Sequence, residues 1–391
     1  MSSRRSRHPI RIRCASGSSV RVAPFVGTIF AESDAPYYLA PAHLLGSGTL
    51  AQSPLAGTPV GTGPYRLTRW LRNDRMELDA NPSYWGGAPS IAHITLRFMP
   101  DENTQLVGLR TGEIDGVLQI SANAATQARA IPDVRIASSA LNAYWGVMMN
   151  NARGPTRDVR VRRALAAAID ARVFRDDVTH GFYTPPIADL PPVLWAADRS
   201  LRPIAYDPVA AHAQLEALGY GPNRPLTLDL AMLQTSQTHR LEAVVLQDEL
   251  RRIGVQVRVH AYQPNVYDAP AADGGILPSG RYDLAFYGWF AGMDPDDSGQ
   301  FSCDQRPPAG YDHAFYCSAA MDAAQRDALR VDDERVRKRA YARIEALLLR
   351  DVPVDVLGSP VALAAWRVHL SGYAPSLVTE TANAQRWRLH S

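Results

Sequence analysis

A strand, a helix and a second strand are predicted in direct succession in the second half of the sequence. Leu226–Leu233 has the composition of a strand, Thr238–Ile253 has helical spacing, and Val255–His260 alternates again after Gly254. A helical connection between two strands favours parallel pairing with a right-handed crossover, because a tight turn cannot join parallel strands. The sequence therefore predicts an α/β fold.

The rest of the chain alternates in the same way. Aspartates that can cap helices stand at Asp101, Asp158 and Asp207, the last followed by a proline. The further strands are predicted over residues 65–70, 76–78, 91–99, 114–118, 144–150, 283–289 and 354–357, and the further helices over 103–109, 158–169, 209–218, 321–329 and 334–349. No repeat of 20–50 residues interrupts this order, so a solenoid or a propeller is excluded.

Length and composition narrow the class of protein. The chain has 391 residues, which predicts two or three domains, and its 46% hydrophobic content can build a sizeable core. The net charge of +2 excludes a globally basic protein, so no nucleic-acid partner is expected. The sequence contains no run of 18 apolar residues, which is the pattern that would predict a transmembrane helix.

The N-terminus is basic and does not resemble a signal peptide. Arg4, Arg5 and Arg7 are followed by the segment Pro9–Arg13, whose arginines interrupt any apolar stretch. Residues 1–18 form a separate basic segment that is unrelated to the rest of the chain. From these residues alone a cytoplasmic location stays open.

The known catalytic motifs are missing. There is no phosphate-binding G-x-x-x-x-G-K-[ST] loop, no G-x-S-x-G elbow and no H-E-x-x-H pair. The ten histidines stand singly, and none is paired at helical spacing. We therefore expect no enzyme activity, no metal site and no cofactor. Cys303 and Cys317 are 14 residues apart, and their spacing leaves open a disulfide or two free thiols.

One segment is the best candidate for a ligand site. Residues 287–297 place aromatic side chains and then acids directly after a predicted strand, as at a ligand crevice in an α/β sheet. Trp289, Phe290 and Met293 are the expected apolar wall, and Asp294 is the expected partner of a cationic group. Tyr144 and Trp145 form a second aromatic pair. The alternatives are a solvated acidic turn and ordinary core packing.

Several segments together resemble the family 5 extracellular solute-binding proteins of ABC importers, which bind dipeptides, oligopeptides or nickel. The motifs stand in order along nearly the whole chain: Pro59–Leu67, Asn81–Trp85, Asp101–Thr104, Leu109–Asp115, Asp158–Leu165, Tyr206–Pro208 and Gly288–Trp289.

The resemblance implies a two-lobed periplasmic-binding-protein fold of type II, in the peptide-binding class, with a hinge and an interlobe cleft. Residues 19–155 and 357–391 would form lobe I and residues 156–356 lobe II. Residues 19–43 already resemble the interior of the family's first lobe, so we expect an N-terminally truncated chain with an incomplete lobe I.

The resemblance also bears on the site. Peptide-binding members carry an aspartate three residues after the tryptophan of their Gly-Trp motif, where it pairs with the peptide's α-amine. Gly292 stands at that position, so either Asp294 replaces the aspartate or the ligand lacks an ammonium group. Dipeptide-binding members have a disulfide near the loop between Cys303 and Cys317, which favours the bonded alternative.

We therefore expect the substrate-binding component of an ABC importer, a monomer outside the cytoplasm. It would bind a peptide or similar small solute and deliver it to membrane permease subunits. The alternatives are a non-functional truncated remnant and a soluble metal-dependent enzyme that uses the acids of residues 287–297.

Overall fold

The centre of the molecule is an eight-stranded mixed sheet. The computed structural model describes residues 44, 52–291, 294–374, 381 and 383–390. The main path of the sheet is β4 (Gly116–Val117), β11 (Val354–Arg367), β6 (Ala143–Met149), β10 (Leu284–Phe290), β8 (Leu226–Leu233) and β9 (Val255–Tyr262). Two further strands, β5 (Val134–Ala140) and β7 (Tyr183–Thr184), pair with β11.

The strand–helix–strand unit is confirmed. β8 and β9 pair in parallel, from Leu226 opposite Val255 to Leu233 opposite Tyr262, and α8 (Gln237–Arg252) connects them. The helix begins after Ser236, whose hydroxyl accepts a hydrogen bond from the His239 backbone N–H at 3.1 Å. This side chain satisfies one of the free amides of the first turn.

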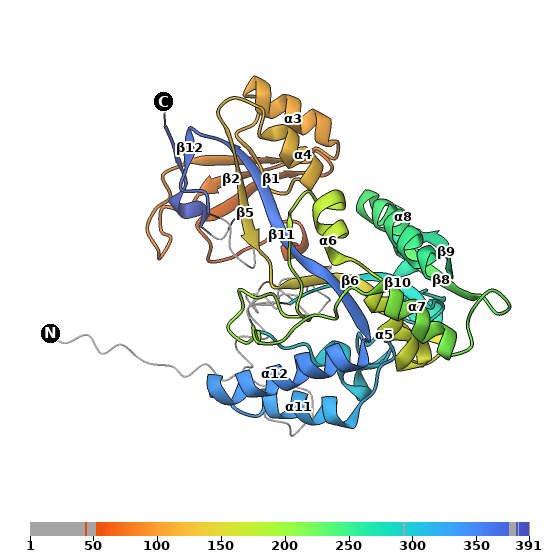
Figure 1. Ribbon diagram of the computed structural model, residues 1–391. Coiled ribbons are helices and arrows are strands. Elements are labelled where there is room, and N and C mark those ends of the chain that lie inside the picture. The colour runs from red at the N-terminus through yellow and green to blue at the C-terminus, as the bar shows by residue number, and fades with distance from the viewer. Residues whose placement is uncertain (1–43, 45–51, 292–293, 375–380, 382, 391) are drawn as a thin grey trace.

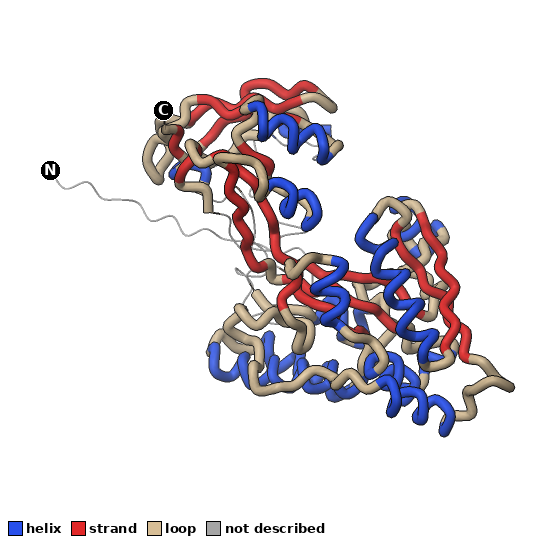
Figure 2. The backbone as a smooth tube through the Cα atoms, turned by 45° about the horizontal axis from the view of Figure 1, so that its top comes forward, coloured by secondary structure: helices blue, strands red, loops and turns tan. Residues whose placement is uncertain are grey.

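Helices cover both faces of this sheet (Figures 1 and 2). One face carries Val147, Leu228 and Phe286, and packs on α5 (Val159–Ala167), α7 (Pro208–Ala217) and α8. The other face carries Met148 and Ala285, and packs on α11 (Ala319–Leu329) and α12 (Glu334–Asp351).

A second part of the molecule has its own core. Leu109 on α3 (Glu102–Thr111) and Ala125 on α4 (Ala122–Ala128) pack against Leu363 and Ala365 of β11. The same part of the chain contains two small sheets, formed by β1 (Tyr65–Leu71), β2 (Arg75–Ala80) and β3 (His93–Arg97), and by β12 (Leu370–Ser371) and β13 (Arg388–Leu389).

Short helical turns complete the described chain. They are η2 (Pro54–Ala56), η3 (Pro155–Arg157), α6 (Ala171–Val173), η4 (Phe174–Val178), α9 (Pro264–Tyr267), η5 (Ala271–Asp273), α10 (Ser298–Phe301), η6 (Cys303–Gln305) and η7 (Ala384–Arg386). Among the helices of the described residues, none has both the length and the apolar character needed to cross a membrane.

One long strand joins the two parts. β11 pairs with β6 over Val354–Gly358 and then with β5 over Val361–Arg367, and Figure 1 shows it passing from the lower to the upper part. The chain passes between the two parts a second time at residues 141–142, which connect β5 to β6. The predicted strand over residues 354–357 was therefore too short. The lobe boundaries near residues 155 and 357 stay a prediction.

Two other expectations need correction. α5 ends at Ala167 instead of running past Ile169, because the Asp170 carboxylate accepts the Arg172 backbone N–H at 3.0 Å and caps a new turn. α4 and β5 were not predicted, because their residues are rich in alanine and serine and lack a clear apolar period.

Candidate functional site

The predicted aromatic residues meet across two paired strands. β10 runs antiparallel to β6, and this register sets Trp289 opposite Tyr144, Gly288 opposite Trp145, and Phe290 opposite Ala143. Because successive residues point to opposite faces, Tyr144 and Trp289 share one face of the sheet and Trp145 lies on the other. We call Tyr144, Trp145, Gly288, Trp289 and Phe290 the aromatic site; it lies where the chain enters the crossing at residues 141–142.

On the face of the sheet that packs on α5, α7 and α8, Trp145 contacts α8. Its Nε1 donates to Glu242 Oε2 at 3.2 Å, and its ring lies 5.0 Å from the His239 ring. The Tyr183 hydroxyl donates to the other Glu242 oxygen at 3.4 Å. Burial raises the pKa of Glu242 to about 7, and these two hydrogen bonds oppose the shift.

Gly288 makes room for the Trp145 ring. A Cβ at this position would lie 2.0 Å from Trp145 Cε3, which no real side chain tolerates. The glycine of the Gly-Trp motif is thus explained by a cross-strand contact. Its missing side chain leaves the space that the Trp145 ring occupies.

On the opposite face of the sheet, Tyr144 and Trp289 lie beside buried polar side chains. The Tyr144 hydroxyl donates to Gln300 Oε1 at 2.6 Å, and burial raises the pKa of Tyr144 well above its usual range, so the phenol stays neutral. The Trp289 ring lies 5.5 Å from the ring of Tyr311. Among the described residues nothing accepts a hydrogen bond from the buried Trp289 Nε1.

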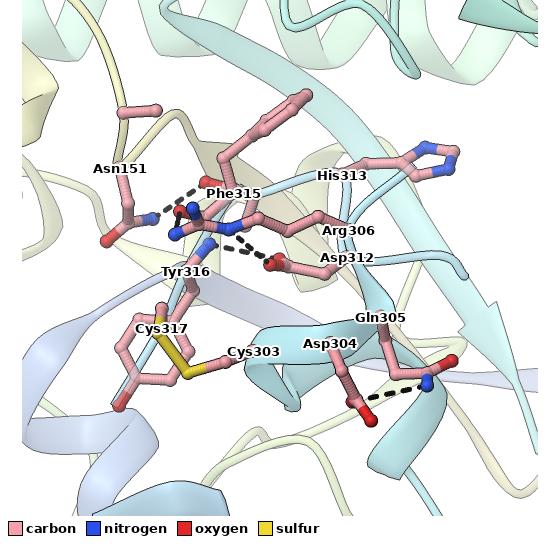
Figure 3. A network of polar contacts seen from close by, with 12 residues as sticks. Asn151, Cys303, Asp304, Gln305, Arg306, Asp312, His313, Phe315, Tyr316 and Cys317 are labelled. Carbon is pink, nitrogen blue, oxygen red and sulfur yellow. Dashed lines mark hydrogen bonds and ion pairs between the residues drawn. A yellow bond between two sulfur atoms is a disulfide. The ribbon is translucent and has the colours of Figure 1, made fainter. Parts of the chain in front are cut away.

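Tyr311 belongs to a loop that a disulfide closes (Figure 3). Cys303 is bonded to Cys317, with their Cα atoms 4.5 Å apart, as the family resemblance implies. Inside the loop the buried Asp312 accepts the Tyr316 backbone N–H at 3.1 Å, and Arg306 lies 3.7 Å from its other oxygen. This framework fixes the loop whose Tyr311 packs on Trp289.

Asp294 has a partner inside the protein. Its two carboxylate oxygens accept hydrogen bonds from Arg337 at 2.7 and 2.8 Å, and both side chains are less than a tenth exposed. A ligand cation would have to share this carboxylate with Arg337, so its predicted role in binding a cation stays a prediction. Gly292 and Met293 lie outside the described residues.

The site offers aromatic surface and neutral hydrogen-bonding groups, which suit non-covalent binding. The described residues contain no group of three or more His, Cys, Asp or Glu side chains placed to hold a metal ion. Glu242, Tyr183 and Tyr311 were not predicted. Glu242 is 97 residues from Trp145 in sequence, and no local pattern marks such a pair.

The chain matches a described protein family and several curated relatives. Residues 26–306 match the bacterial extracellular solute-binding proteins, family 5 Middle. The chain is 28% identical to the Di/tripeptide-binding protein 2 of Pseudomonas aeruginosa (strain UCBPP-PA14) over 326 residues, 82% of this chain and 60% of that protein. It is 29% identical to the glutathione-binding protein GsiB of Escherichia coli (strain K12), over 81% of this chain and 62% of GsiB. It thus spans about 60% of the length of these relatives.

Solved structures share the fold. The oligopeptide-binding protein AppA from Bacillus subtilis, in complex with a nonapeptide, superposes with a TM-score of 0.74 at 22% identity, covering 90% of this chain and 72% of that chain. DppA from Helicobacter pylori, in complex with the peptide STSA, has a TM-score of 0.71 at 25% identity, covering 85% of this chain and 64% of that chain. The predicted two-lobed type II fold is confirmed. The family match covers more than half of the chain, and so the chain belongs to the family 5 bacterial extracellular solute-binding proteins.

Proposed function

We propose that this chain is the substrate-binding component of an ABC importer. It holds a peptide or a similar small solute between two lobes and passes it to membrane permease subunits outside the cytoplasm. Lobe I is assigned to residues 19–155 and 357–391 and lobe II to residues 156–356. The observation that carries the proposal is the aromatic site, which lies beside the chain crossing in a member of this family.

The proposed mechanism is closure of the lobes around the ligand. The connection at residues 141–142 and the middle of β11 are the two links that bend. A ligand that contacts both lobes favours the closed state by its differential contacts, and no covalent step is required. The protein is therefore a binding protein with no turnover.

The aromatic site supplies one wall of the proposed cleft. Trp289 and Phe290 come from β10, and Tyr144 and Trp145 from β6. Gly292 and Met293 follow β10 in sequence and are assigned to the same wall. Because the relatives bind di- or tripeptides and glutathione by name, short peptides are the first ligands to test.

Titration calorimetry with di- and tripeptides tests the proposal. Trp289→Ala removes the ring at the centre of the site, and we expect peptide affinity to fall by about tenfold or more, the typical effect of losing an aromatic anchor. Trp85→Ala is the matched control, since Trp85 is 83% exposed and lies outside the site. Equal peptide affinity in both variants would contradict the assignment of the wall.

A further inference from the structure

A separate pocket lies at the edge of the central sheet. It opens between α6, the C-terminal end of α12, the start of β11 and two connecting segments, residues 185–189 and 202–206, and its volume is about 590 Å³. This size falls in the range of sites that enclose small organic molecules. None of the residues of the aromatic site lines this pocket.

The walls of this edge pocket are mainly apolar. Three prolines and several aliphatic side chains from four different segments line it, including Ile169, Pro185, Pro186, Ile187, Ile204 and Val356. Such walls favour an occupant with an apolar body, because its transfer from water gains about 25 cal/mol per Å² of buried apolar surface.

Most charged groups of the edge pocket have partners. Arg172 pairs with Asp170 at 2.7 Å. Arg175 pairs with Asp176 at 2.7 Å. Arg202, exposed at the rim, donates to backbone carbonyls of residues 199–201. These contacts leave no arginine of the pocket directed at an acid of β11.

Apart from the buried Asp189, whose Oδ1 also lacks a hydrogen-bond partner among the described residues, the unmatched acid of the pocket is Asp355. It lines the pocket from β11, and within the described residues no hydrogen bond or ion pair reaches its carboxylate. Burial, together with the negative charge of Glu249 on α8, raises the pKa of Asp355 to about 8. Glu249 itself accepts the Asp170 backbone N–H, at 3.2 and 3.3 Å.

An unpaired carboxylate in a largely apolar pocket is costly unless a cation compensates it. We propose that the edge pocket binds a protonated amine with an apolar body, whose ammonium group pairs with the Asp355 carboxylate. This second ligand site is independent of the aromatic site and goes beyond the proposed importer function.

Two probes that differ only in charge test this site. 2-Phenylethylamine carries an ammonium group and an aromatic ring, and 2-phenylethanol keeps the ring without the charge. Titrations of the full chain at about pH 8.5 keep Asp355 ionised. We expect the amine to bind at least about tenfold more tightly than the alcohol, a difference of ~1.4 kcal/mol.

Three variants assign the binding to Asp355. Asp355→Asn keeps the shape and removes the charge, so amine affinity should fall by about tenfold or more. Asp248→Asn is the matched control, because Asp248 is on the exposed side of α8 and outside the pocket. Ala205→Trp fills the exposed rim and should block the amine with Asp355 intact.

The outcomes separate this site from the proposed importer function. Trp289→Ala should leave amine binding unchanged while peptide binding weakens. Equal binding of amine and alcohol, no binding by the folded wild-type chain, or undiminished amine affinity in Asp355→Asn would each overturn the proposal. Loss of amine binding in Trp289→Ala would place the amine at the aromatic site instead and would also overturn it.

Discussion

At the scale of single residues, the aromatic site depends on contacts that local sequence does not reveal. Trp145 and Gly288 are 143 positions apart in sequence and face each other because β6 and β10 pair in one register. Asp294 and Arg337 are separated by 43 residues and still form a buried bidentate pair. The identity of each residue was readable from the sequence, but its partner was set by the tertiary fold.

The Asp294–Arg337 pair should be needed for stability. In Asp294→Asn the buried guanidinium loses its counter-charge, and breaking one side of a buried ion pair costs about 3–5 kcal/mol. Urea unfolding should show a lower midpoint. The double variant Asp294→Leu with Arg337→Met removes both charges and should recover much of this loss. A stable Asp294→Asn protein with altered ligand affinity would instead assign the carboxylate to binding.

Gly288→Ala should displace Trp145. The new Cβ would lie 2.0 Å from the ring, so the indole must move and its hydrogen bond to Glu242 is lost. We expect a loss of about 1–3 kcal/mol in unfolding free energy, as for other overpacked sites, together with changed tryptophan fluorescence. Gly61→Ala is the control, because a Cβ there meets no atom within 4 Å. Equal stability of the two variants would show that the described contact is wrong.

At the scale of elements, regular segments were predictable and the crossing was not. The Asp101 cap and the parallel pair β8–β9 followed from capping residues and apolar alternation. The 14-residue β11 was predicted over its first four residues only, because Gly358 and Pro360 interrupt the pattern typical of a strand. In the structure Pro360 lies on β11 opposite Tyr183 of the two-residue strand β7. The register shift between Val356 and Gly358 falls just before it, in the pairing of β11 with β6.

The disulfide should stabilise the loop that carries Tyr311. Cys303 and Cys317 close a loop with a sequence separation of 14, for which chain entropy predicts about 3 kcal/mol. Replacing both cysteines by serine should lower the unfolding temperature under oxidising conditions. A reducing agent should then lower that temperature in the wild-type chain and not in the variant. No change on replacement would mean that the loop is held by its other contacts, among them the Asp312–Tyr316 hydrogen bond.

At the scale of the whole molecule, buried acids dominate the expected pH dependence. Burial raises the pKa values of Glu242, Glu249 and Asp312 to about 7 and those of Glu345 and Asp355 to about 8. Burial also lowers the pKa values of His239 and His313 to about 4. Below pH 6.5, the usual pKa of histidine, the buried acids and the buried histidines change the stability in opposite directions as the pH changes.

Stability should therefore fall as the pH rises from about 7 to 8.5. In this range the native acids still hold protons that the unfolded chain, with carboxyl pKa values near 4, has already released. Stability decreases with pH wherever the native state binds more protons, and we expect a loss on the order of 2 kcal/mol over this range. Unfolding temperatures at both pH values measure it, and Glu345→Gln should flatten the decline. A constant or rising unfolding temperature would contradict these pKa shifts.

Binding of a solute between the two lobes can be tested by thermal unfolding of this chain with and without a pool of short peptides. A ligand at 100 times its Kd adds about 2.7 kcal/mol, which corresponds to several degrees in unfolding temperature. We expect one cooperative transition that moves upward with the pool, and fractionation would then identify the ligand. A cooperative transition that no peptide moves would contradict peptide binding by this chain, and a broad transition without cooperativity would support a non-functional remnant.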